Sequence, residues 1–273
     1  MADENTPEPS YTLYVYCTRY SSWGVRAQLI LEYFKIPYKV QYFNYTDPAL
    51  TPPPELKTLP VLDVTPAPGL APSTEGETLR IPDSLAIGEY LADQHPDKQL
   101  WPADPQLRAL ARTAAAQMHS GFAALRDAYP CNFIARFSGP GVPFDDAVAG
   151  DVRKLFALWG SVRVAAKKRL AQLGETDRGF LCGGFSIADA FFWPVLWRLR
   201  TYNVPLTGIT EDGLKWMNTM WNDPVMKEQA GEYFRQARDP QTRMALYDDV
   251  FKDSADVTSS TFAEDWVFNM GSI

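Results

Sequence analysis

Short strand-like and helix-like patterns alternate over the first third of the chain. Apolar residues recur every three or four positions from Val25 to Phe34, which predicts a helix, and a second helix is predicted from Ser84 onward. Four segments rich in aromatic and β-branched residues have the length of strands: Tyr11–Cys17, Tyr38–Phe43, Leu59–Val64 and Thr78–Ile81. The order strand, helix, strand, strand, strand, helix is typical of a small α/β domain with a mixed sheet.

Only helical periodicity follows, from residue 105 to about residue 251. Long apolar stripes run from Leu107 to Leu125 and from Val152 to Leu170, and shorter ones cover about 187–202, 213–221, 225–237 and 242–251. Phe137–Phe144 breaks this pattern and is expected to form a flexible lip. The residues from Asp253 onward lack periodicity and are expected to pack through Phe262, Trp266 and Phe268. This half is predicted to be an all-helical bundle.

A proline-rich stretch, His95–Pro105, separates the two halves, because closely spaced prolines prevent a continuous helix. We therefore predict two domains, residues 1–97 and residues 104–273. Residues 1–105 carry 14 acidic and 7 basic side chains, and this difference equals the formal net charge of −7. Such a shift in composition supports two differently built units.

Charge and apolar content exclude several classes of protein. A nucleic-acid-binding surface needs clustered Lys and Arg, which 33 acidic against 26 basic side chains do not favour. The longest apolar stretch, Ala190–Trp197, is far shorter than the roughly 20 residues that span a bilayer, and the acidic N-terminus has no signal pattern. The cysteines Cys17, Cys131 and Cys182 lie far apart in no metal-ligand spacing. We expect a cytoplasmic protein without a metal.

Two serine motifs stand at predicted helix starts. Ser21 and Ser22 precede the first helix, where a hydroxyl and the helix N-terminus together lower the pKa of a bound thiol. Simple helix capping explains the same pair. Gly184–Asp189 resembles a capping box and opens the most apolar helix of the chain, which is a structural role.

Two further motifs suit the binding of a peptide-like ligand. Pro60 opens a strand, and a cis Leu59–Pro60 bond would turn the backbone of Leu59 outward for pairing with an extended peptide. Asp83 and Ser84 stand at the start of the second helix, where unpaired N–H groups bind a carboxylate and an acidic side chain binds an ammonium group. An ordinary trans proline and an N-cap serine are the simpler interpretations.

Together, and in this order, the motifs resemble those of a cytosolic glutathione transferase. The resemblance covers residues 11–250 and rests on the strand–serine–helix start, L-P-V-L at 59–62, D-S-L-A-I at 83–87 and G-G-F-S-I-A-D at 183–189. It implies a thioredoxin-like N-terminal domain that binds glutathione and an all-helical domain that supplies an apolar substrate pocket. It also implies a homodimer.

The resemblance assigns roles in glutathione binding. The backbone of Leu59, next to Pro60, would pair with the cysteinyl part, and Asp83 with Ser84 would hold the γ-glutamyl end. Lys57 would meet the glycyl carboxylate. Most relatives have Glu or Gln at the position of Asp83, and Asp is one methylene shorter.

The activating residue of this family varies among Ser, Tyr and Cys. The run Y-S-S-W-G-V-R at 20–26 resembles serine-type members, including zeta-like ones, and favours Ser21, although an alignment shift of one residue exchanges it with Ser22. The alternatives are a tyrosine, among Tyr14, Tyr16 and Tyr20, or the thiol of Cys17 in a thiol-transferase. Cys17 lacks the proline that normally follows such a cysteine, and a buried thiol explains it equally well.

Candidates for the second-substrate pocket lie near the end of the first long helix: His119, Phe122 and Tyr129. Between Pro60 and Ser84 the chain is longer than in the family, and the excess at Thr65–Thr78 is predicted to form an extended hairpin loop. The C-terminal extension is a candidate cap over the pocket.

We therefore expect a glutathione transferase whose activated thiol attacks a small apolar electrophile. One alternative is a glutathione-dependent cis–trans isomerase, which adds the thiol reversibly to a conjugated double bond. The other is a non-catalytic ligand carrier with the same fold. No nucleic acid, membrane or metal is expected to take part.

Overall fold

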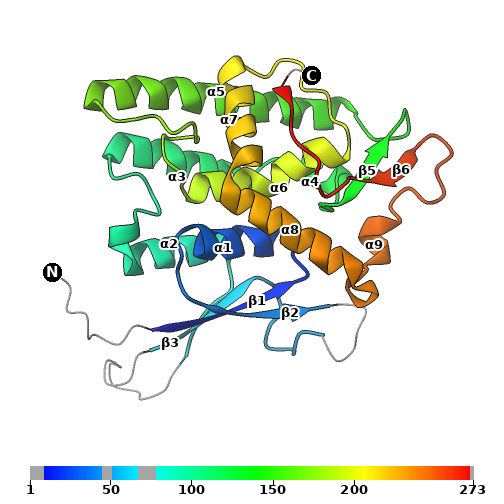
Figure 1. Ribbon diagram of the computed structural model, residues 1–273, viewed down its shortest axis with the longest axis horizontal. Coiled ribbons are helices and arrows are strands. Elements are labelled where there is room, and N and C mark those ends of the chain that lie inside the picture. Colours follow the sequence, from blue (N-terminus) through cyan, green and yellow to red (C-terminus); the bar gives the residue numbers. More distant parts are fainter. Residues whose placement is uncertain (1–8, 45–50, 67–77, 271–273) are drawn as a thin grey trace.

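The computed structural model describes residues 9–44, 51–66 and 78–270. A mixed sheet of four strands, in the order β2-β1-β3-β4, forms the base of the N-terminal part. Its strands are β1 (Ser10–Tyr16), β2 (Lys39–Phe43), β3 (Val61–Thr65) and β4 (Leu79–Ile81). β2 runs parallel to β1, whereas β3 runs antiparallel to both of its neighbours. The helices α1 (Ser22–Tyr33) and α2 (Ser84–Gln94) lie between this sheet and the helical part (Figure 1).

The junction between β1 and α1 is tightly packed. Alternate residues of β1 are buried, as expected of a strand with one face on the core. The first turn of α1 approaches β1 so closely that a Cβ on Gly24 would lie 3.0 Å from Val15 Cγ1 and 3.0 Å from Ser21 Oγ. Glycine at this position therefore fixes where Ser21 and Ser22 stand.

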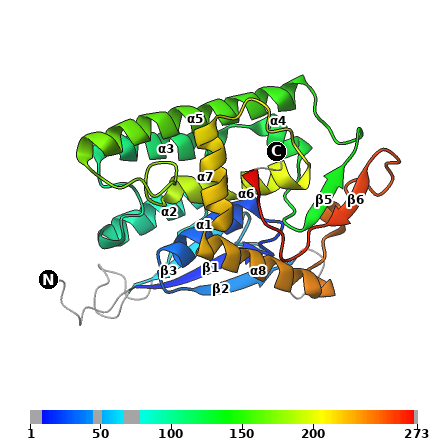
Figure 2. The same ribbon diagram turned by 45° about the horizontal axis from the view of Figure 1, so that its top comes forward.

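The rest of the chain is mainly helical. Its helices are the short η2 (Pro96–Lys98), α3 (Pro105–Ser120), α4 (Ala123–Ala128), α5 (Asp146–Leu173), α6 (Ile187–Thr201), α7 (Glu211–Asn222), α8 (Pro224–Arg238), the short η3 (Pro240–Thr242) and α9 (Ala245–Asp248). Every residue of α6 except Arg200 is buried, because other elements surround this helix (Figure 2). One continuous hydrophobic core runs through both halves.

The predicted fold class, an α/β part followed by a helical part, is confirmed, and the C-terminal residues pack through Phe262, Trp266 and Phe268 as expected. The boundary between residues 97 and 104 stays a prediction. The predicted hairpin loop at Thr65–Thr78 lies largely outside the described residues. No helix in the described ranges has the length and apolar composition needed to span a membrane.

Three predictions about individual elements were wrong. The stripe from Leu107 to Leu125 is not one helix, because Phe122 adopts a left-handed backbone conformation (φ 57°) that an α-helix cannot continue through. Phe137–Phe144 is not a free lip, because β5 (Ala135–Ser138) pairs antiparallel with the C-terminal strand β6 (Thr258–Thr261). The expected helix at 242–251 is reduced to α9.

Candidate active site

A cleft of about 560 Å³ opens between the sheet part and the helical part. One wall comes from the β1–α1 junction and the segment before β3, and the other comes from α4, α6 and the segment around α9. It is lined by the predicted residues Ser21, Ser22, Lys57 and Leu59, together with two of the alternative activating residues, Tyr16 and Tyr20. A cleft of this volume suits a small molecule.

The two serines occupy different positions at the start of α1. Ser21 is the N-cap, and its Oγ accepts a hydrogen bond from the Gly24 N–H at 3.2 Å. Ser22 is the first helical residue and is 8% exposed, and its Oγ accepts from Arg198 Nη2 at 3.4 Å. Both hydroxyls keep their proton for donation at a helix N-terminus, where the macrodipole favours an anion.

Arg198 brings a buried positive charge to this point. Its side chain comes from α6, and the residue is 5% exposed. Nε donates to the Tyr129 carbonyl at 2.8 Å and Nη1 to the Pro194 carbonyl at 3.3 Å, so that two backbone groups orient Nη2 toward Ser22. No carboxylate pairs with Arg198 among the described residues. Sequence reasoning missed this residue, although an arginine within the most apolar helix was a usable signal.

The segment before β3 contributes the backbone predicted to meet a peptide-like ligand. The Leu59–Pro60 peptide bond is cis. Pro60 is buried and does not line the cleft, whereas the half-buried Leu59 and the exposed Lys57 do. Leu59 and Lys57 thus lie in the same cleft as the two serines.

Asp83, rather than Ser84, caps α2. Asp83 Oδ1 accepts from the N–H groups of Leu85 and Ala86, both at 2.9 Å, and Oδ2 lies 3.3 Å from His119 Nε2. Ser84 is 2% exposed, and its Oγ has no hydrogen-bond partner in the described part of the chain. These residues lie beside the cleft without lining it.

Trp23 lies between the residues that line the cleft and the pair formed by Asp83 and His119. Its ring lines the cleft and lies edge-on to the His119 ring, with centroids 5.4 Å apart. Arg126, which also lines the cleft, stands 5.4 Å from the centroid of the Trp23 ring. A ligand that reaches from Ser22 toward Asp83 would therefore pass Trp23.

None of the three residues predicted for the second-substrate pocket lines the cleft, and His119 approaches it only through its ring contact with Trp23. Tyr129 is 1% exposed, stacks on Tyr202 and donates its hydroxyl to the Pro143 carbonyl at 2.5 Å. Phe122, at the break between α3 and α4, lines a separate hollow with Gln117. Because the helix is broken at Phe122, the rings of Phe122 and Tyr129 do not reach the cleft. Tyr129 affects the cleft only through its carbonyl, which accepts a hydrogen bond from Arg198.

The helical wall of the cleft also differs from the apolar pocket that the resemblance implies. It carries Arg126, Asp127 and Arg198 beside the thiol of Cys131. Burial raises the pKa of Cys131, and the nearby Arg198 partly opposes this effect. Tyr247, from α9, also lines the cleft, whereas the residues of the C-terminal extension that were predicted to cap it line a different cavity.

Among the alternative activating residues, Tyr16 also lines the cleft, whereas Tyr14 stacks on Phe43 and both Cys17 and Tyr20 are engaged elsewhere. Cys17 is buried and donates its thiol to Gln236 Oε1 at 3.1 Å, and burial raises its pKa. Tyr20 lines the cleft, but its hydroxyl donates to Asp248 Oδ2 at 2.7 Å and burial raises its pKa. In the described part of the chain no three His, Cys, Asp or Glu side chains gather as metal ligands would.

Comparison with known proteins identifies a family for the helical part and a curated relative over about a third of the chain. Residues 105–219 match the family described as glutathione S-transferase, C-terminal domain. Pyrimidodiazepine synthase of Drosophila melanogaster is 35% identical over 96 residues, which cover 34% of this chain and 36% of that protein. The chain thus spans only about a third of the curated relative that it matches.

Solved structures share the fold over most of the chain. A glutathione transferase homologue from Burkholderia, with bound glutathione, has a TM-score of 0.54 at 19% identity and covers 85% of this chain and 99% of its own. Maleylacetoacetate isomerase from Anaeromyxobacter dehalogenans has a TM-score of 0.55 at 20% identity, with coverage of 89% and 100%. At these identities the likeness establishes the fold alone.

Proposed function

Residues 105–219 belong to the glutathione S-transferase C-terminal domain family and the chain has the glutathione transferase fold, and on this premise we propose that the protein binds glutathione and activates its thiol. The contact between Ser22 and Arg198 at the N-terminus of α1 supports this proposal most strongly. Leu59 and Lys57 border the same cleft and would hold the peptide. Ser84, with its unpartnered buried hydroxyl, would receive the γ-glutamyl end.

The proposed activation is electrostatic. A free thiol has a pKa near 8.5, so that little thiolate exists at neutral pH. A hydroxyl donor, a guanidinium and a helix N-terminus each favour the anion. Together they need to supply about 2.7 kcal/mol to lower the thiol pKa by about two units.

Ser22 is the stronger candidate for the donor. Arg198 donates to its oxygen, which polarises the O–H bond toward the cleft. Ser21 instead uses its oxygen to cap α1, which stabilises the helix start. Replacement of Ser21 is therefore expected to affect stability more than the thiol pKa.

The charges of the cleft support an electrophile that carries a carboxylate. Arg126 and Arg198 on the helical wall outweigh Asp127. A thiolate held here would attack the electrophilic carbon of such a substrate and form a carbon–sulfur bond. The displaced electron pair either departs with a leaving group from that carbon or, after addition to an activated double bond, takes up a proton. In the isomerase alternative it would add to a conjugated double bond and leave again after rotation, so that glutathione is regenerated.

Near-ultraviolet difference titration of bound glutathione tests the activation. The wild-type protein is compared with Ser22→Ala, Arg198→Met and Ser21→Ala, with Ser161→Ala as the matched control on the outer face of α5. We expect thiolate at neutral pH in the wild type and a thiol pKa higher by about one unit in the first two variants. Ser161→Ala should match the wild type.

Saturable glutathione binding without thiolate in the wild type would favour the ligand carrier and reject the proposal. If thiolate forms, product analysis separates the two reactions. A sulfur-containing product with consumption of glutathione indicates transfer. A sulfur-free isomer with glutathione unchanged indicates isomerisation.

A further inference from the structure

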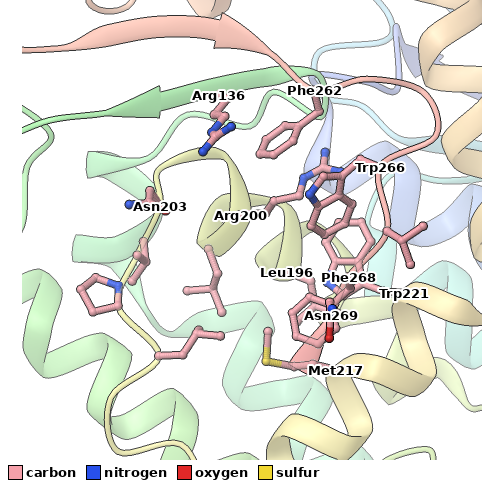
Figure 3. A pocket seen from close by; sticks show the side chains of 15 residues that line it. Arg136, Leu196, Arg200, Asn203, Met217, Trp221, Phe262, Trp266, Phe268 and Asn269 are labelled. Atoms are coloured by element: carbon pink, nitrogen blue, oxygen red, sulfur yellow. The ribbon is translucent and has the colours of Figure 1, made fainter. Parts of the chain in front are cut away.

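A second cavity, of about 460 Å³, is lined by Leu196, Leu199 and Arg200 of α6, whereas Arg198 of the same helix lines the cleft (Figure 3). It shares no lining residue with the cleft. Its walls come from α6, the segment after α6, α7 and the C-terminal tail, residues 262–269. We call it the tail cavity.

The C-terminal tail is firmly docked where it closes the cavity. Pairing of β6 with β5 brings the tail back to the helices, and the Phe262 N–H donates to the Ile134 carbonyl at 2.9 Å. The Trp266 ring then meets the Trp221 ring edge-on, with centroids 5.0 Å apart. The cavity is therefore built by the fold and is not a gap beside a loose end.

Arg200 places a guanidinium among the rings that line the tail cavity. Its Cζ lies 4.2 Å from the centroid of Phe262, 4.7 Å from that of Trp221 and 4.8 Å from that of Trp266. Its Nε is buried without a hydrogen-bond partner among the described residues. Burial lowers the pKa of Arg200 to about 9, so it stays charged at neutral pH.

Arg136 adds a second positive charge at the same end. Its Cζ stands 5.7 Å from the Phe262 centroid, and Figure 3 shows both guanidinium groups beside this ring. The described residues that line the cavity include two arginines and no acidic side chain. Arg136 is exposed, whereas Arg200 is half-buried and its Nη2 donates to the Phe133 carbonyl. No carboxylate pairs with the Arg200 guanidinium among the described residues, and a bound anion would offset the cost of its partial burial.

The other walls are apolar and largely aromatic. Trp221, Trp266 and Phe268 line the space together with Leu196 and Met217 (Figure 3). Flat rings of this kind pack well against a planar apolar body. We propose that the tail cavity binds a small aromatic molecule that carries one anionic group, with the anion at Arg136 and Arg200 and the rings against Trp221 and Trp266.

Anilinonaphthalene sulfonate is a suitable probe, with neutral N-phenylnaphthylamine for comparison, and both are titrated by fluorescence into the full chain. We expect one equivalent of the sulfonate to bind. Arg136→Met should weaken it about tenfold, the loss expected of one charge-assisted contact, and leave the neutral probe unchanged. The matched control is Arg126→Met, which removes an arginine from the cleft instead and should leave both probes unaffected.

A steric variant tests the location independently of charge. Leu206 lines the tail cavity and is half-buried, and Leu206→Trp should fill the space and abolish binding of both probes. Wild-type binding by Leu206→Trp would overturn the proposal. Equal weakening of sulfonate binding by Arg126→Met and Arg136→Met would also overturn it. The sulfonate would then respond only to the net charge of the protein, or it would bind in the cleft.

Discussion

The buried carboxylate of Asp189 accepts four hydrogen bonds, and its removal is expected to destabilise the fold strongly. Asp189 is fully buried at the start of α6. Oδ1 accepts from the Leu181 N–H and from Trp216 Nε1, both at 2.9 Å. Oδ2 accepts from the N–H of Ser186 at 3.0 Å and from its Oγ at 3.1 Å. One side chain thus joins the start of α6 to α7 and to the preceding loop.

Asp189→Ala leaves three buried N–H donors without an acceptor, while the Ser186 hydroxyl can rotate toward another partner. At about 1–3 kcal/mol for each unpaired donor, the loss exceeds the relief from no longer burying a charge. We expect the free energy of unfolding to fall by about 4 kcal/mol, which lowers Tm by about 8 °C or more. Asp189→Asn keeps the shape of the side chain but turns an NH₂ group toward two of the donors. We expect it to lower the free energy of unfolding by about 2 kcal/mol.

Urea and thermal unfolding, followed by tryptophan fluorescence and circular dichroism, measure both variants. The matched control is Asp145→Ala, which removes an exposed N-cap carboxylate that accepts one hydrogen bond, from the Val148 N–H at 2.8 Å. It should cost about 1 kcal/mol. A loss for Asp189→Ala no larger than that of Asp145→Ala would refute the reasoning, because the buried hydrogen bonds would then contribute no more than an exposed cap.

Three further predictions follow from single sites. Burial raises the pKa of Cys17, and we therefore expect its thiol to react with dithiobis(nitrobenzoate) only after the protein unfolds. Rapid labelling of Cys17 in the native protein would restore the thiol-transferase alternative. Hydrogen bonds from Arg169 lower the pKa of Asp104 to about 2, so its stabilising contribution is present above the unfolded value near 3.9 and is lost as the pH falls toward 2. Asp104→Asn should therefore flatten stability between about pH 4 and pH 2, and urea midpoints that still fall as in the wild type would contradict this assignment. Gly139 has φ 124°, and a Cβ at this position would lie 2.3 Å from the Asp256 carbonyl oxygen. Gly139→Ala should therefore loosen the β5–β6 pairing and speed proteolysis of the C-terminal tail. Cleavage of the tail at the wild-type rate would count against this contact.

The candidate site was predictable wherever its residues are close in sequence. Ser21 and Ser22 stand at the predicted helix start, and Leu59 stands next to a strand-opening proline whose peptide bond is cis. Asp83 and Ser84 begin the second helix. Asp83 is its N-cap, whereas the simpler interpretation gave that role to Ser84. These positions follow from turn and cap chemistry, which acts over a few residues.

Residues from the helical half were harder to predict. Periodicity suggested that Phe122 continues an apolar stripe, but it does not show that the chain turns at this residue. The same turn directs the hydroxyl of Tyr129 to Pro143 and its carbonyl to Arg198. An apolar residue can satisfy a helical pattern and still face a different neighbour once the helix is broken.

The sequence by itself determined the four strands of the first sheet, the starts of α1 and α2, the order of the two parts and the motifs of the family, because each depends on side chains within a few positions of one another. Only the tertiary structure decided that Arg198 meets Ser22, which lies 176 positions earlier in the chain. It also decided that Arg200 stands among the rings of the C-terminal tail. These contacts depend on how whole helices pack and on how the tail returns through β6, and such long-range geometry leaves no local periodic signal.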